Sequence, residues 1–242
     1  KTIIQLTVRN FQNIFLILVP TENPNMESLF TLLLIVHIAN GATGLIAGTI
    51  NLIRRKGDLL HKRIGLVFTY AMILAGISAI VLSILHPNHF LTIVGVFTVY
   101  MVSTGYRYIR LRLTEVDNDP KAWDWFLTVC MGLAGLWFIF MGVRALIASE
   151  TFGIVLIVFG VISLLFVRTD LKNYRGKAGH RNYWLLAHLQ RMTGGYIAAL
   201  TAFLVVNADN FPSVIPGIVL WLLPTAVLTP LIIIWSRKYE AK

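Results

Sequence analysis

The chain has 242 residues, of which 57% are hydrophobic and 13% are charged, whereas about a quarter of the residues in a typical soluble domain are charged. The formal net charge is +10, but the basic residues gather in short segments between apolar runs, which argues against nucleic-acid binding. The single cysteine, Cys130, lies within an apolar run, so we expect neither an intrachain disulfide nor a cysteine-based metal cluster.

The N-terminal segment, residues 1–25, is the least regular part of the sequence. Its longest continuous apolar run, 14–19, is too short to span a bilayer, and no small-residue cleavage site of the kind that ends a signal peptide follows it. We therefore predict that residues 1–25 are an upstream extension or an interfacial segment. Residues 26–242 are then a single transmembrane domain.

Apolar segments long enough to cross a bilayer, which takes about 20 residues, follow one another along the rest of the chain. Short turns or charged linkers separate them. We predict an all-α integral membrane protein, a bundle of seven transmembrane helices. The predicted spans are residues 29–53, 64–85, 90–109, 125–148, 152–167, 184–207 and 214–235.

Lysine and arginine predict the orientation of this bundle. Seventeen of the 21 lie in the segments that follow the first, third, fifth and seventh spans, and the three intervening turns hold none. Because basic loops stay on the cytoplasmic side, we expect the N-terminus outside and the C-terminus in the cytoplasm.

The sixth predicted span carries His188 and Arg191 inside its apolar run. Ionisable residues at membrane depth are costly, so they are candidates for a functional site. Arg191 lies about 10 Å along the helix from Trp184 and therefore needs an anionic partner. The candidates are Asp124, Asp170, and a haem propionate or another anionic headgroup.

The first predicted span has small residues along one helical face, which is roughly 40° wide. Such a stripe allows helices to pack closely, and it is also compatible with a slot for a planar cofactor beside His37. The residues on this face are His37, Gly41, Gly44, Gly48 and Asn51.

Histidines on different spans suggest a b-type haem site, because haem iron binds neutral imidazole from two helices. We expect His61 to approach His188 near the cytoplasmic side, as haem or metal ligands, with Arg191 as a propionate contact. His86 is expected to approach His37 near the outer side, as a second cofactor-binding arrangement. His86 and His89 are alternatively a surface metal site.

Several stretches resemble a bacterial family of uncharacterised predicted membrane proteins. The likeness covers about residues 26–239 and is strongest in HIANGATGLIAGTINLIRRKGDLLHKRIGLVF, SILHPNHFLTIVGVFTVYMVSTGYR, AHLQRMTGGYIAALTAFLVVN and WLLPTAVLTPLIIIW. The resemblance implies a multi-pass protein of the bacterial cytoplasmic membrane. It implies no established activity and assigns no residue roles.

Three functions are compatible with these patterns. The first is a membrane accessory or electron-transfer subunit that binds b-type haem. The second is a small-solute or proton transporter that uses His188 and Arg191. The third is an accessory subunit whose glycine faces pack against other membrane subunits. The sequence contains no nucleotide-binding loop and no nucleophile–base motif. We therefore expect the lipid bilayer and other membrane subunits as partners, and we do not expect an enzyme that acts alone.

Overall fold

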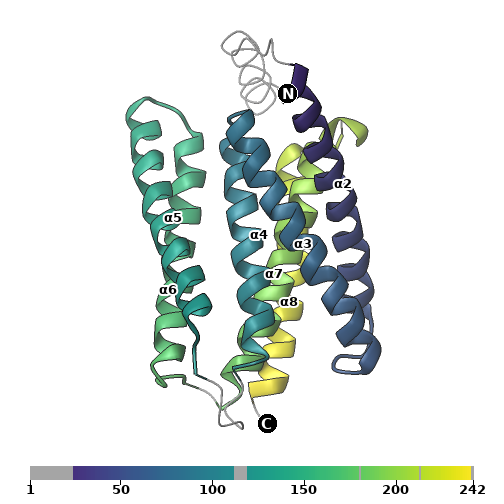
Figure 1. Ribbon diagram of the computed structural model, residues 1–242, viewed down its shortest axis with the longest axis vertical. Coiled ribbons are helices and arrows are strands. Elements are labelled where there is room, and N and C mark those ends of the chain that lie inside the picture. Colours follow the sequence, from purple (N-terminus) through teal and green to yellow (C-terminus); the bar gives the residue numbers. More distant parts are fainter. Residues whose placement is uncertain (1–23, 112–118, 180, 213, 241–242) are drawn as a thin grey trace.

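The computed structural model describes residues 24–111, 119–179, 181–212 and 214–240. These residues form helices joined by turns, with no strand among them. The prediction for residues 1–25 falls almost entirely outside this part of the chain. The helices, labelled as in Figure 1, are α2 (Pro24–Ile53), α3 (Leu59–Leu85), α4 (His89–Tyr108), α5 (Ala122–Ile147), α6 (Phe152–Tyr174), α7 (Tyr183–Val206), the short 3-10 helix η1 (Ala208–Asn210) and α8 (Gly217–Glu240).

Seven of the helices in the described residues are long and apolar enough to cross a membrane, which confirms the predicted number. The fifth span is longer than predicted. Its helix, α6, continues past Val167 to Tyr174, through a stretch that the charges of Arg168 and Asp170 had marked as a linker. The helix tolerates Asp170 there because this carboxylate is paired inside the bundle.

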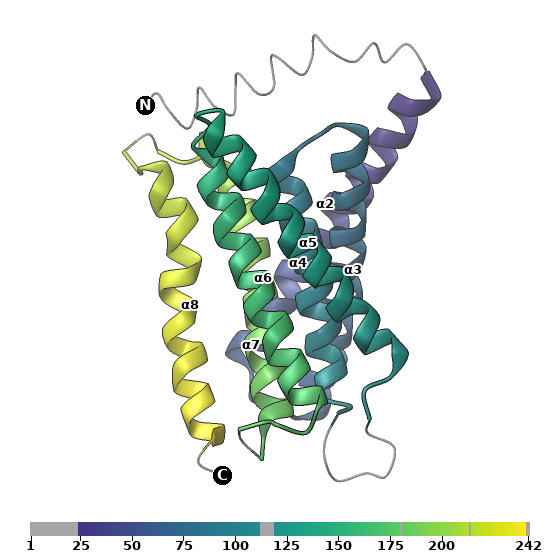
Figure 2. The ribbon, with the colours of Figure 1, turned by 90° about the vertical axis from the view of Figure 1, so that its left-hand side faces the viewer.

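The helices alternate in direction, and consecutive helices mostly lie side by side (Figure 1). Helix α4 packs between α3 and α7, while α2 packs on α3 and α8 packs on α7. The hairpin formed by α5 and α6 stands to one side of α4, and the perpendicular view in Figure 2 shows it in front of the other helices. The protein is therefore a bundle of five helices with a helical hairpin docked on it.

The α5–α6 hairpin is held together by glycines that let the two backbones approach closely. A Cβ atom on Gly142 would lie 2.7 Å from the carbonyl oxygen of Gly153, and one on Gly160 would lie 2.7 Å from that of Gly135. Any larger residue at these positions would force the helices apart. The seven-residue spacing on each helix is a small-residue interface of the kind that membrane helices use.

Of the three apolar clusters in the described residues, the two larger ones fill most of the bundle. One joins α4 to the hairpin and includes Phe97 of α4, whose ring meets that of Phe159 of α6 edge to face at 4.9 Å. The other joins α2, α3, α7 and α8 around Phe68 and Tyr196. We call the end at which α2, α4, α6 and α8 finish the basic end, because the basic segments gather there; the C-terminus also lies at this end (Figure 1).

Candidate functional site

A buried ion pair joins α6 to α7 in the half of the bundle nearer the basic end. Nη2 of Arg191 lies 2.5 Å from Oδ1 of Asp170, and the two side chains are 2% and 0% exposed. Nη1 of Arg191 donates to the hydroxyl of Thr104 on α4 at 2.8 Å. Of the partners expected for Arg191, the structure therefore assigns Asp170, and its donors are engaged within the protein.

Three hydroxyl groups complete the shell around the Asp170 carboxylate. The hydroxyls of Tyr100 and Tyr108, both on α4, donate to Oδ2 and Oδ1, each at 2.6 Å, and Thr128 of α5 donates to Oδ2 at 3.2 Å. Together with Nη2 of Arg191, these donors engage both oxygens of the buried Asp170 carboxylate.

Aromatic rings surround the guanidinium group of Arg191. Its Cζ atom lies 4.8 Å from the ring centre of Tyr100, 5.3 Å from that of Tyr108 and 5.0 Å from that of Phe166. Ring faces attract a cation, and the attraction is stronger where water is excluded. The face of α4 that carries Tyr100, Thr104 and Tyr108 therefore lies against the guanidinium group.

A second ion pair attaches the hairpin to α4 closer to the basic end. Arg107 binds Asp124 through two hydrogen bonds of 2.6 Å each, one from Nε and one from Nη2. Asp124 is completely buried, while the Arg107 side chain is 20% exposed. Asp124 also accepts from the backbone N–H of Lys121, which helps to start α5. Asp124, the other candidate partner of Arg191, is thus used by Arg107.

His188 lies one turn before Arg191 on the same helix and is bonded to α4. Its Nδ1 atom lies 2.8 Å from the carbonyl oxygen of Gly105, so Nδ1 carries the proton and donates. This arrangement leaves the lone pair of Nε2 available. A backbone carbonyl that holds one imidazole nitrogen is the usual support for a metal-binding histidine.

His61 lies in the first turn of α3, where hydrogen bonds hold its backbone N–H and its carbonyl oxygen. Asp58 caps the helix by accepting the backbone N–H of His61 at 2.6 Å. The carbonyl oxygen of His61 accepts a bond from the side-chain amide of Asn51 on α2 at 3.2 Å. His61 and His188 both lie near the start of helices that begin at the basic end, and their approach stays a prediction.

Buried polar atoms without a hydrogen-bond partner lie toward the basic end of the bundle. Among the described residues they are Oδ1 of Asn51, Nε of Arg54, Nδ1 of His61 and Oγ of Ser236. An unsatisfied buried polar atom costs about 1–3 kcal/mol, so proteins keep few of them without a reason. Their location at one end of the bundle marks this region as a place where a ligand would find donors and acceptors.

Lys56 connects this region to the end of α8. Its ammonium group donates to the carbonyl oxygens of Asn51 and Leu52, each at 2.7 Å, and lies 4.6 Å from the ring centre of Trp235. Partial burial lowers the pKa of the Lys56 side chain. Lys56, Arg54 and Ser236 were not among the site residues predicted from the sequence; Asn51, at the end of the glycine stripe, was the available signal.

His37 and His86 do not form a comparable pair. Nδ1 of His37 lies 2.9 Å from the carbonyl oxygen of Ala75, which ties α2 to α3. The ring of His86 packs against that of Phe30 at 4.3 Å, and Phe30 lies two helical turns, about 10 Å, from His37 along α2. The arrangement expected near the outer side is therefore two separate histidine contacts.

The glycine stripe of α2 serves helix packing. A side chain on Gly44 would overlap Met72 of α3, and one on Gly48 would overlap Phe68 of α3 and Tyr196 of α7. These neighbours fill the stripe at Gly44 and Gly48, whereas a Cβ atom on Gly41, one turn from His37, would have no atom within 4 Å. The described residues contain no group of three or more histidine, cysteine or acidic side chains that could hold a metal ion.

Comparison of the chain with protein-family models, with curated proteins and with solved structures finds no match.

Proposed function

We propose that this chain is a multi-pass protein of the bacterial cytoplasmic membrane that binds b-type haem between α3 and α7, with His61 and His188 as axial ligands. Its role would be that of a membrane electron-transfer or accessory subunit. The proposal rests mainly on His188, whose Nδ1 atom is held by the carbonyl of Gly105 while Nε2 stays available. It also rests on His61, whose buried Nδ1 atom has no partner.

The surroundings of the two histidines suit haem in charge as well as in ligand type. Iron takes neutral imidazole, and the buried carbonyl of Gly105 favours one tautomer of His188. The propionates of haem need cationic donors, and Nε of Arg54 is a buried donor without a partner. Arg191 is already bound to Asp170, so Arg54 replaces it as the proposed propionate contact: Nη2 of Arg54 pairs with Asp58, and its Nε is the donor left for a propionate.

The positive-inside rule places the basic end, and with it the haem site, on the cytoplasmic side of the membrane. The N-terminus is then outside and the C-terminus inside. The alternative function, transport of a proton or small solute through His188 and Arg191, has less support, since both nitrogens of Arg191 that would meet a solute donate to Asp170 and Thr104.

The visible absorption spectrum of the full chain, produced with haem supplied and purified in mild detergent, tests the proposal. We expect a Soret band that is lost in His61→Ala and in His188→Ala. His37→Ala is the matched control, because His37 also bonds a carbonyl oxygen between helices but lies outside the proposed site. A folded wild-type protein without a Soret band would refute haem binding, and equal loss in the control would refute the assignment of the ligands.

A further inference from the structure

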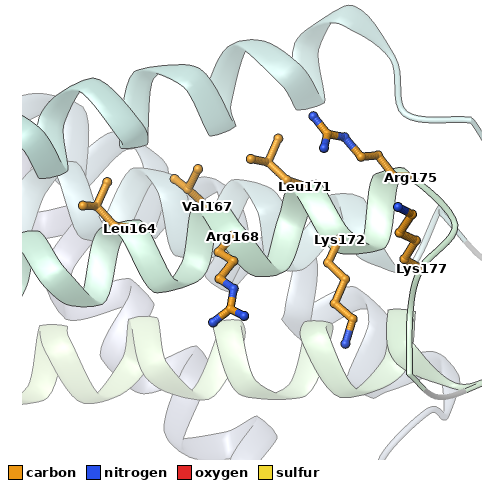
Figure 3. Close-up of a pocket in the computed structure, with 7 residues that line it drawn as sticks. All are labelled: Leu164, Val167, Arg168, Leu171, Lys172, Arg175 and Lys177. Carbon is orange, nitrogen blue, oxygen red and sulfur yellow. The ribbon is translucent and has the colours of Figure 1, made fainter.

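The last turns of α6 carry an open pocket of about 480 Å³ (Figure 3). This volume is within the range of roughly 300–1,000 Å³ that small-molecule sites have. Its apolar part is formed by Leu164, Val167 and Leu171, which are spaced to lie along one face of the helix. Its charged part consists of Arg168, Lys172, Arg175 and Lys177.

The four cations of this pocket are exposed, and none forms an ion pair within the described part of the chain. Other cations nearby behave differently, since Arg107 and Arg191 each bind a buried carboxylate. Asp170, the acidic residue on the same helix, is completely buried against Arg191 and does not neutralise the pocket. The pocket therefore presents a concentrated positive charge to its surroundings.

The polarity of the pocket changes along the axis of α6. Leu164 lies toward the middle of the helix, and Arg175 lies about 16 Å further on, at its end. Figure 3 shows the leucine and valine side chains along the helix and the cations becoming denser toward the basic end. A lipid has the same order of groups, because its acyl chain lies at membrane depth and its headgroup lies at the surface.

We propose that this pocket binds an anionic phospholipid. Its phosphate lies among the four cations, and an acyl chain lies along Leu164, Val167 and Leu171. Basic residues near a membrane surface each strengthen the binding of anionic lipid by roughly fivefold. The inference goes beyond the proposed function and does not depend on haem, because the pocket lies on the outer face of α6 and not between α3 and α7.

Native mass spectrometry of the full chain in a neutral detergent tests the proposal. The protein is titrated with phosphatidylglycerol, with phosphatidylcholine and with inorganic phosphate. The pocket variant is Arg168→Gln/Lys172→Gln/Arg175→Gln/Lys177→Gln. The matched control removes four other exposed charges at the basic end and is Arg55→Gln/Lys62→Gln/Arg63→Gln/Lys238→Gln.

We expect the wild-type protein and the control to retain phosphatidylglycerol at least about tenfold more tightly than phosphatidylcholine, and the pocket variant to lose this preference. Melting temperatures of the three proteins without lipid check that all are folded. Equal loss of binding in the control variant would show general charge attraction and overturn the proposal. Binding of inorganic phosphate as tight as that of the lipid would overturn the role of the acyl chain.

Discussion

The carbonyl oxygen of Gly105 accepts a hydrogen bond from Nδ1 of His188, and the missing side chain of the same glycine leaves room for Arg191. A Cβ atom on Gly105 would lie 3.1 Å from Cβ of Arg191 and 3.1 Å from Sδ of Met192. One position of α4 therefore sets both the imidazole of the proposed haem site and the guanidinium of the buried ion pair.

Gly105→Ala is expected to destabilise the protein, since overpacking of this contact costs about 1–3 kcal/mol. Thermal unfolding in detergent measures the effect. Gly41→Ala is the control, because a Cβ atom on Gly41 of α2 has no atom within 4 Å, and alanine there favours the helix. Similar melting temperatures for the two variants would contradict the close approach of α4 and α7 at Gly105.

The Asp170–Arg191 pair is expected to show strong coupling. Asp170→Asn and Arg191→Met each leave one buried polar partner without its counterpart, which costs about 3–5 kcal/mol. The double variant leaves no unpaired charge, so it should be more stable than the sum of the single changes predicts. Arg191→Lys should retain stability only in part, because an ammonium group lacks the planar fork whose two nitrogens separately reach Asp170 and Thr104. Additive losses would mean that the two residues do not interact.

The Asp58 cap of α3 is expected to make stability depend on pH. The hydrogen bond from the backbone N–H of His61 lowers the pKa of the Asp58 carboxyl below its ordinary value, and the hydrogen bond from Arg54 lowers it further, by a smaller amount. A carboxyl with a lowered pKa stabilises the folded state above its ordinary pKa of about 4, and this contribution is lost as the pH falls through the lowered value. Asp58→Asn keeps a capping oxygen but cannot titrate.

Melting temperatures of the wild-type protein and Asp58→Asn, measured at a series of pH values below about 5, should therefore converge as the solution becomes more acidic. Other carboxylates titrate equally in both proteins, so the difference isolates Asp58. Parallel curves would show that the charge of Asp58 has no role in the cap.

Reporter fusions test the proposed orientation. Fusions on the side of the short turns should be periplasmic, after Leu85, Ala148 and Asn207. Fusions on the side of the basic segments should be cytoplasmic, after Lys56, Lys121 and Arg181. The reason is that segments rich in lysine and arginine cross the bilayer less readily than apolar or acidic segments. A cytoplasmic signal from any of the first three fusions would be incompatible with seven alternating spans.

The number of spans could be predicted because the hydropathy of each segment can be read from that segment alone. The ends of the spans could not, because they depend on contacts between helices. The sequence placed the end of the fifth span at Val167, since Arg168 and Asp170 follow it. In the structure the helix runs on to Tyr174, because Arg191 and the tyrosines of α4 compensate the buried carboxylate. The hydropathy of one segment does not show which residues of other helices will pair with its charges.

The candidate site could be predicted only as a set of residue types. Arg191 clearly needed an anion, but Asp124 and Asp170 were equivalent choices until the packing of α5 and α6 on α4 was known. Helical periodicity also could not show that Met72 lies over Gly44 and Tyr196 over Gly48 in the glycine stripe of α2. His61 and His188 both lie near the start of helices that begin at the same end, as the predicted spans implied, but whether the two rings meet stays a prediction.

Two ion pairs attach the α5–α6 hairpin to the rest of the bundle, Arg107–Asp124 to α4 and Asp170–Arg191 to α7, and both are in the half nearer the basic end. The other half is held by apolar contacts such as Phe97 against Phe159. The hairpin is therefore attached more strongly at the basic end than at its turn. Separation of the hairpin from α4 should begin at its turn, near Ser149, and spread toward Asp170 as the last contact to break. Lipid tails, and not water, would enter the opening first.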